Sequence, residues 1–463
     1  MPEQLKKASL YVLFFALLLG TLWRGGYFPT QKWTLAFALL AAGAVEVAAS
    51  IALRQARALR SPAFWLLVAF SLFAVSTLGW SAVPGDTQRE SMLLAGYLAA
   101  FFVARSQIGR GGRQAAESIA SWLVYAAAFS SAWGLVTFLW RLGPYATMLD
   151  NVFRAGSTFE YSNALSCFAL MALPVTVALG RRVDAWLRPL LAVAISLQAA
   201  AVLISYARFG IVAFIVLLFF FAATGWRDGQ ALSTVFSLLA SVPIAVVATI
   251  TSESNNPVAG LLVAVVILAI SGIVERYLET SRLKNMLGPV AGATAAAGIA
   301  AAAVLAGASS RMRVIISTRF SNGFNWDRLM PHRLDTWQGT IDSFKVRPVT
   351  GSGLGSFPFI YTSHAIAVYT KYAHNLILQM AVDTGITGAA LLVLFLGYVV
   401  VLSLWRVIRQ ARSLAGAFSV TCLVFVAYNM FDWEWYVPAL TAWFMVAAAC
   451  LEESSPNGNA GPD

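Results

Sequence analysis

The sequence predicts an all-α polytopic membrane protein with about 12–14 transmembrane helices. Of its 463 residues, 59% are hydrophobic and only 11% are charged. A chain of this composition has more apolar surface than one soluble core can bury. Windows of about 20 mostly apolar residues, long enough to cross a hydrocarbon layer of roughly 30 Å, recur along nearly the whole chain.

The predicted spans follow one another in order. The first comes after Lys6 and Lys7 and has no small-residue cleavage site at its far end, so we interpret it as a retained signal-anchor helix. The fourteen windows lie near 8–23, 34–53, 63–80, 91–105, 119–140, 163–180, 189–206, 209–225, 231–250, 258–274, 288–307, 386–405, 414–431 and 434–451. A long connection at 308–373 separates the eleventh window from the twelfth, and its size asks for a functional reason.

Basic residues are distributed unequally between alternate connections. One set holds 18 of them, whereas the opposite short connections hold six: Arg24, Lys32, Arg89, Arg141, Arg154 and Arg208. By the positive-inside rule the first set is cytoplasmic, so both termini lie inside and the 308–373 loop lies outside. We expect one transmembrane domain over 1–451 and a disordered cytoplasmic tail over 452–463. The net charge of +11 is mostly these topological charges, so no nucleic-acid partner is predicted.

Aromatic and acidic residues at the span ends have simple interpretations. Eight tryptophans are typical of interfacial anchors: Trp23, Trp33, Trp80, Trp140, Trp186, Trp226, Trp433 and Trp435. On the outer side the carboxylates Asp150, Glu160, Asp432 and Glu434 are scattered rather than paired, so we expect no metal centre. Asp432 and Glu434 are interpreted as part of a tight turn between two spans.

The outer loop contains two local patterns. Trp337, Ile341 and Phe344 recur at three- and four-residue spacing, which predicts a short amphipathic helix on the outer surface, ending before Pro348. Gly351, Gly353 and Gly355 follow. This run lacks the Lys-Ser/Thr ending of a nucleotide-binding loop, so it predicts a tight turn or a close approach of backbone to ligand.

Arginines on the outer side are candidates for an anion site. The 308–373 loop has a formal balance of +5, although a solvated basic surface is an alternative interpretation. Arg208 lies in a turn so short that its guanidinium must be at the membrane boundary, and Arg154 precedes Gly156-Ser157-Thr158. Because the planar guanidinium offers two parallel hydrogen bonds and keeps its charge, a lipid pyrophosphate would suit these positions.

His374 is the candidate base. It stands with Asn375 where the outer loop enters an apolar helix, and Gly385 and Gly388 follow at a fixed offset. An imidazole is partly neutral at physiological pH and can accept a proton from a hydroxyl. The alternative is a hydrogen-bonded structural histidine. His332 and His364 are interpreted as surface residues.

Taken together, these motifs resemble the superfamily of bacterial O-antigen ligases and O-antigen polymerases. The matching residues are His374-Asn375 with Gly385 and Gly388, the Ser205–Gly210 turn, Gly156-Ser157-Thr158 with Asn163, and Arg333, Trp337, Phe344, Pro348, Gly351 and Gly353.

The resemblance implies a membrane glycosyltransferase of the bacterial plasma (inner) membrane with its active site on the outer face. The donor would be a glycan on undecaprenyl pyrophosphate, and the acceptor a sugar hydroxyl on a lipid-linked or other glycan. Transfer would invert the anomeric centre without a metal or other cofactor. By carry-over, His374 is the general base, Arg208 and Arg333 hold the pyrophosphate, and Arg154 and Arg319 are weaker candidates for that role.

Three functions remain open from the sequence. The single large outer loop favours a ligase acting in lipopolysaccharide synthesis. The alternative within the superfamily is an O-antigen or exopolysaccharide polymerase, which would have a chain-length regulator as a partner. A lipid-linked glycan flippase would also have many spans, but its charged residues are expected near the midplane of the membrane.

Overall fold

The computed structural model describes residues 2–55, 57–149, 152–225, 229–280, 333–366 and 369–452. The helices in this part of the chain are α1 (Pro2–Leu22), α2 (Pro29–Ala52), α3 (Pro62–Ser76), α4 (Pro84–Leu139), α5 (Ser162–Gly180), α6 (Arg188–Ile204), α7 (Arg208–Gly225), α8 (Gly229–Glu253), α9 (Pro257–Thr280), α13 (Arg333–Phe344), α14 (Phe357–Tyr361), α15 (Leu376–Gln410), α16 (Leu414–Asn429) and α17 (Pro438–Cys450). Short 3₁₀ turns include η3 (Thr77–Trp80) and η5 (Glu434–Tyr436).

The predicted all-α membrane fold is confirmed. Within the described residues, eight helices are long and apolar enough to cross a bilayer, and four shorter apolar helices accompany them. The windows 91–105 and 119–140 lie in the two parts of α4, which meet at a kink at Gly112, where φ is 50° and ψ is −130°. The predicted span 288–307, Arg319 and the tail from 453 onward lie outside the described residues.

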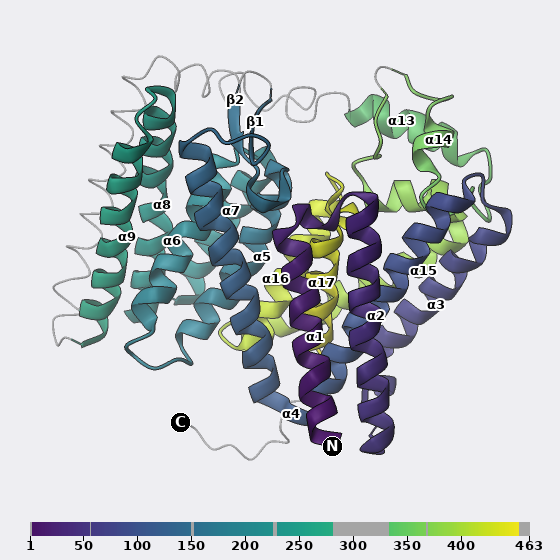
Figure 1. Ribbon diagram of the computed structural model, residues 1–463, viewed down its shortest axis with the longest axis horizontal. Coiled ribbons are helices and arrows are strands. Elements are labelled where there is room, and N and C mark those ends of the chain that lie inside the picture. Colours follow the sequence, from purple (N-terminus) through teal and green to yellow (C-terminus); the bar gives the residue numbers. More distant parts are fainter. Residues whose placement is uncertain are drawn as a thin grey trace. The chain divides into compact units, whose positions relative to one another are not determined.

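The chain forms two compact units. Unit 1 comprises residues 1–20, 26–119 and 335–463, and unit 2 comprises residues 21–25 and 120–334. In unit 1, α15 packs against α3 and α16, and α16 packs against α17 (Figure 1). Every residue of α17 is buried. A helix that is apolar all round belongs in an interior, so α17 forms part of the core.

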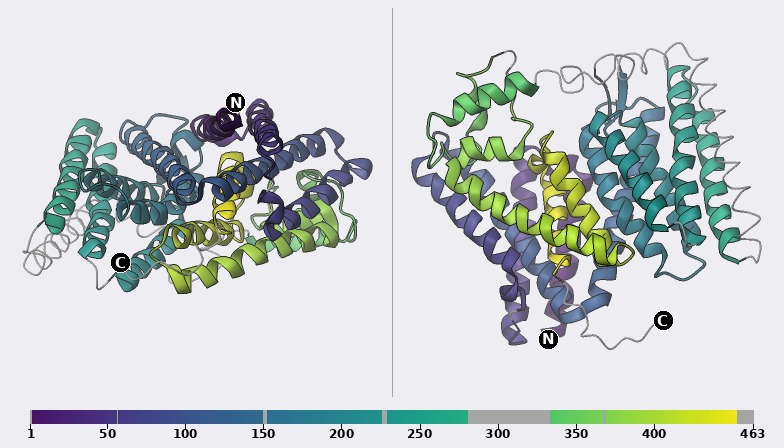
Figure 2. Two further views of the ribbon diagram at one scale, coloured as in Figure 1. Left: turned by 90° about the horizontal axis from the view of Figure 1, so that it is seen from below. Right: turned by 180° about the vertical axis from the view of Figure 1, so that it is seen from behind.

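Unit 2 is built around α6. This helix packs against α5, α8 and α9, and the teal helices of this unit run side by side in both views of Figure 2. A feature that the sequence did not predict is an antiparallel hairpin of β1 (Ala146–Leu149) and β2 (Val152–Ala155), in which Thr147 pairs with Arg154. The hairpin gives Arg154 a fixed place in an otherwise irregular connection.

Candidate active site

The start of α15 fixes the position of His374. Asn375 is the N-cap, and its side-chain oxygen accepts a hydrogen bond from the backbone N–H of Leu378 at 3.0 Å. Its amide nitrogen donates to the carbonyl of Met430 at 3.1 Å, which ties the cap to the end of α16. His374 has a φ of 53°, in the left-handed region that non-glycine residues rarely adopt. The cap therefore holds the imidazole in one constrained place.

His374 is paired with a carboxylate. Its Nδ1 lies 2.9 Å from Oδ1 of Asp432, and the two side chains are 18% and 8% exposed. Asp432 also accepts a hydrogen bond from the backbone N–H of Trp433 at 3.0 Å. An ionised carboxylate can only accept, so the proton of a neutral imidazole lies on Nδ1 and the lone pair on Nε2. This arrangement orients an imidazole as a base.

Sequence reasoning missed Asp432. It was grouped with scattered carboxylates because it lies 58 residues from His374 along the chain. The signal that could have found it is topological. Asp432 occupies a tight connection on the side of the membrane where the outer loop ends, so the predicted spans place both residues at the same surface.

The glycine-rich run of the outer loop docks against a kink in α15. Gly385, with φ 66° and ψ −176°, interrupts the helix, and its N-terminal neighbours bind the loop through their carbonyls. Val382 accepts from the N–H of Ser352 at 3.1 Å, and Asp383 accepts from that of Gly353 at 2.9 Å. A Cβ on Gly351 or on Gly385 would overlap backbone atoms of the other segment. The predicted tight turn is present, and the backbone that it approaches is that of α15.

Asp383 of α15 binds the same loop through its side chain. This fully buried carboxylate accepts hydrogen bonds from the backbone N–H groups of Gly355 at 3.0 Å and Phe357 at 2.7 Å. The hydroxyl of Ser356 donates to it at 3.3 Å. Asp383 therefore satisfies the N–H of Phe357, the first residue of α14, and connects the glycine turn to α15, whose N-cap is Asn375.

We expect Asp383→Ala to destabilise the protein by about 2–5 kcal/mol, because two buried backbone donors lose their acceptor. Asp383→Asn keeps an acceptor oxygen and should cost less. Thermal unfolding of the purified variants in detergent measures both effects. An unchanged midpoint for the alanine variant would show that the carboxylate does not hold this loop.

The predicted amphipathic helix is α13, but its buried face differs from the expected one. The buried residues are Thr336, Gly339, Thr340 and Ser343, whereas Ile341 is 40% exposed. This face consists of small residues because the chain at His364 packs closely against it: a Cβ on Gly339 would overlap the carbonyl of His364. Trp337 has a specific role, since its indole N–H donates to the carbonyl of Ala373 at 3.1 Å, one residue before His374.

Arg154 holds the Ser205–Gly210 turn, which contains Arg208 and lies in unit 2. Arg154 is only 5% exposed, and its guanidinium donates to the carbonyl of Ser205 at 2.7 Å and to the side-chain oxygen of Asn163 at 2.6 Å. Tyr206, with a φ of 50°, turns the chain, and Arg208 then begins α7. Arg154 thus positions the turn that carries Arg208.

The structure places the candidate residues in both units. Arg154, Arg208 and Arg333 lie in unit 2, and His374, Asn375, Gly385 and Gly388 lie in unit 1. Arg333 is the first residue of α13. The grouping of these arginines with His374 around one substrate remains a prediction.

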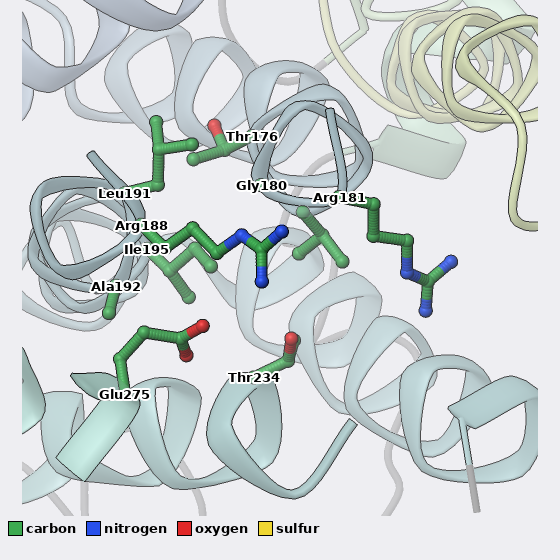
Figure 3. A pocket seen from close by; sticks show the side chains of 10 residues that line it. Thr176, Gly180, Arg181, Arg188, Leu191, Ala192, Ile195, Thr234 and Glu275 are labelled. Atoms are coloured by element: carbon green, nitrogen blue, oxygen red, sulfur yellow. The ribbon is translucent and has the colours of Figure 1, made fainter. Parts of the chain in front are cut away.

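A small pocket with a mixed polar and apolar lining lies elsewhere in unit 2, between α5, α6, α8 and α9. Figure 3 shows the side chain of Arg188 extending into it, with Thr234 and Glu275 from the opposite helices among the lining residues. It contains none of the predicted site residues. Arg181 and Arg188 belong to the basic set that the charge distribution assigns to the cytoplasmic side, so this pocket is distinct from the predicted outer-face site.

The fold and the His374–Asp432 pair define a multi-pass membrane protein with an oriented imidazole just outside its apolar helices. Residues 240–393 match the family model described as O-antigen ligase, which confirms the resemblance to the superfamily of O-antigen ligases and polymerases. That family implies a glycosyltransferase-like activity. The matched range includes Arg333, the glycine turn, His374, Gly385 and Gly388, but neither Arg208 nor Asp432. No curated protein matches the chain.

Proposed function

We propose that this protein transfers a glycan from undecaprenyl pyrophosphate to a sugar hydroxyl at the outer face of the bacterial plasma membrane. The observation that carries the proposal is the hydrogen bond between His374 and Asp432 at the end of the outer loop. The match to O-antigen ligases over residues 240–393 supports the same class of chemistry. Both termini are then cytoplasmic, as the distribution of basic residues indicates.

In the proposed reaction, His374 Nε2 accepts the proton of the acceptor hydroxyl as its oxygen bonds to the anomeric carbon of the donor sugar. The bond from that carbon to the pyrophosphate oxygen breaks, and undecaprenyl pyrophosphate leaves with the electron pair. Attack opposite the leaving group inverts the anomeric centre. Asp432 keeps the proton on Nδ1 and stabilises the imidazolium that forms.

The arginines take different roles in this proposal. Arg208 and Arg333 bind the pyrophosphate and stabilise the charge that develops on it. Arg319 is a weaker candidate for the same role. Arg154 acts indirectly, because its guanidinium is engaged by Ser205 and Asn163 and so holds the turn before Arg208.

Transfer by the purified protein in proteoliposomes tests the function. Labelled undecaprenyl-pyrophosphate glycan is supplied with lipid A-core in one arm and with a second lipid-linked glycan in the other. A ligase labels only lipid A-core, and a polymerase lengthens the lipid-linked glycan; each new bond releases one undecaprenyl pyrophosphate. Movement of the labelled lipid between leaflets with no new glycosidic bond would instead identify a transporter and refute the proposal.

Arg208→Lys should lower the transfer rate by about 10- to 100-fold even though the charge is kept, because an ammonium cannot supply the paired hydrogen bonds of a guanidinium. The matched control is Arg141→Lys. Arg141 is another outer-side arginine of unit 2, and it donates to Ser252 at 3.2 Å. The control should transfer at close to the wild-type rate. Equal rates for both variants would remove Arg208 from the pyrophosphate site.

A further inference from the structure

Four aromatic rings of unit 1 form a cluster, which we call the aromatic platform: Tyr27, Tyr372, Trp433 and Tyr436. Tyr372 is stacked between Trp433 and Tyr436, with ring centroids 4.6 Å and 5.0 Å away. Tyr27 lies 5.6 Å from Trp433 and 6.4 Å from Tyr372. Separations in this range are those of favourable aromatic pairs. The platform therefore has a defined geometry.

The platform and the His374–Asp432 pair are built from the same two chain segments. Tyr372 lies two residues before His374, and Trp433 directly follows Asp432. The hydroxyl of Tyr372 donates to that of Tyr27 at 3.1 Å. Burial, followed by the neighbouring Tyr27, raises the pKa of Tyr372 well above its usual value, so this hydroxyl stays protonated and keeps its hydrogen bond to Tyr27. Stacking thus fixes the rings at a constant offset from the imidazole.

The rings of the platform differ in their access to the surroundings. Tyr372 and Tyr436 are each 6% exposed and serve as its buried support. Tyr27 and Trp433 are only half-buried. The exposed side chain of Lys371 places its ammonium 4.9 Å from the centroid of Tyr27 and 5.5 Å from that of Tyr372. This ammonium also donates to the hydroxyl of Tyr27 at 3.2 Å, so the accessible part is an aromatic surface with a cation lying over the ring of Tyr27.

We propose that Tyr27 and Trp433 bind the pyranose ring of the acceptor glycan and so present its hydroxyl to His374. The inference rests on the proposed transfer function. The C–H face of a pyranose is apolar and weakly positive, which suits the negative face of an aromatic ring. Lys371 can donate a hydrogen bond to a hydroxyl or to an acidic substituent of the sugar.

An interfacial anchor is the other use of aromatic residues at a span end, and it was the interpretation of Trp433 and Trp435 from sequence. Trp435 does not fit that use, because it is 5% exposed and packs against Phe425 and Tyr97. Trp433 is stacked flat on Tyr372 beside the proposed base. An anchor role predicts no dependence of acceptor binding on Tyr27 or Trp433, so the two roles can be separated.

Acceptor kinetics and direct binding test the inference. The main variants are Tyr27→Ala, which is far along the chain from the histidine pair, and Trp433→Ala. Each should raise the KM for the acceptor by about 3- to 10-fold, with kcat and the KM for the donor little changed. Tyr27→Phe keeps the ring and should keep the KM. Trp405→Ala is the matched control, because Trp405 also carries a cation, Arg409, at 5.1 Å but lies near the far end of α15.

Direct binding is measured with two glycan probes. One is released by mild acid from lipid A-core and the other from undecaprenyl-pyrophosphate lipids, both taken from the cell that produces this protein. Calorimetry is performed with the His374→Ala protein, so binding is measured without turnover. Weaker binding after Tyr27→Ala or Trp433→Ala supports the platform, and the probe that binds identifies the acceptor source.

The two proposals fail in different ways. Thermal unfolding first establishes that both alanine variants are folded. If both then keep the wild-type KM for the acceptor and the wild-type glycan affinity, the platform is overturned and the transfer function is left intact. Absence of transfer by the wild-type protein would overturn the function. In that case, glycan binding that still depends on Tyr27 would uphold the platform as a sugar site, and a lack of glycan binding would overturn it as well.

Discussion

His374→Ala should lower kcat for glycan transfer by about 100- to 10,000-fold, the range typical of a lost general base. The KM values should change little, because in the proposed reaction the imidazole acts on the acceptor proton mainly in the transition state. Steady-state transfer in proteoliposomes measures both constants. Transfer by this variant at the wild-type rate would exclude His374 as the base.

Two companion variants make this result specific. His364→Ala removes another outer-loop histidine, whose Nδ1 lies 3.1 Å from the carbonyl of Ile360, and it should leave transfer within about threefold of wild type. Asp432→Asn should slow transfer by roughly 10- to 1,000-fold. The amide can present an N–H to the imidazole and so favour the tautomer with its proton on Nε2, which cannot act as a base.

Gly385→Ala should destabilise the protein by at least about 3 kcal/mol or prevent its folding in the membrane. The backbone at Gly385 has φ 66° and ψ −176°, a conformation that is essentially limited to glycine. An added Cβ would also overlap the carbonyl of Val349 in the docked loop. Because Asp383 of α15 also binds this loop at the start of α14, we expect the variant to lose both stability and transfer. Thermal unfolding and the yield of monodisperse protein measure the effect.

Gly397→Ala is the matched control for this prediction. Gly397 lies in the same helix, and a Cβ there would meet no atom within 4 Å. Its replacement should leave the unfolding temperature unchanged or slightly higher, because alanine is the better helix former. Similar unfolding temperatures for the two variants would contradict the docking account of Gly385.

The spans could be predicted because the length and apolar composition of a segment decide whether it crosses a membrane. Their ends were less accurate. Helix α4 begins at Pro84 rather than near 91, whereas the division between the windows 91–105 and 119–140 matches the kink at Gly112, where two helices meet. Helix α15 likewise consists of two helices that meet at Gly385. The second matches the predicted window from 386, and the first, which Asn375 caps, was not predicted.

The local part of the candidate site was also accessible from sequence. The spacing of His374, Asn375, Gly385 and Gly388 reflects a cap and a kink within one helix, and such features involve near neighbours in the chain. Asp432 and Asp383 were missed because their importance comes from segments brought together by folding. A carboxylate gives no sign in its own surroundings that an imidazole or a helix start lies beside it.

Arg154 illustrates the same difference. Its position before Gly156-Ser157-Thr158 indicated an anion ligand, but two hydrogen bonds engage its guanidinium in holding the turn of Ser205. The charge of an arginine can be read from sequence, whereas its partners depend on the pairing of β2 and on the end of α6. The stacked rings of Tyr372, Trp433 and Tyr436 likewise join residues that are about 60 positions apart along the chain.

A double-mutant cycle on the transfer rate tests the functional coupling of His374 and Asp432 most directly. If Asp432 acts through the imidazole, the double variant His374→Ala with Asp432→Asn should be no slower than His374→Ala alone, within about threefold. If the two losses multiply instead, the residues act independently, and the oriented-base account of this site is wrong.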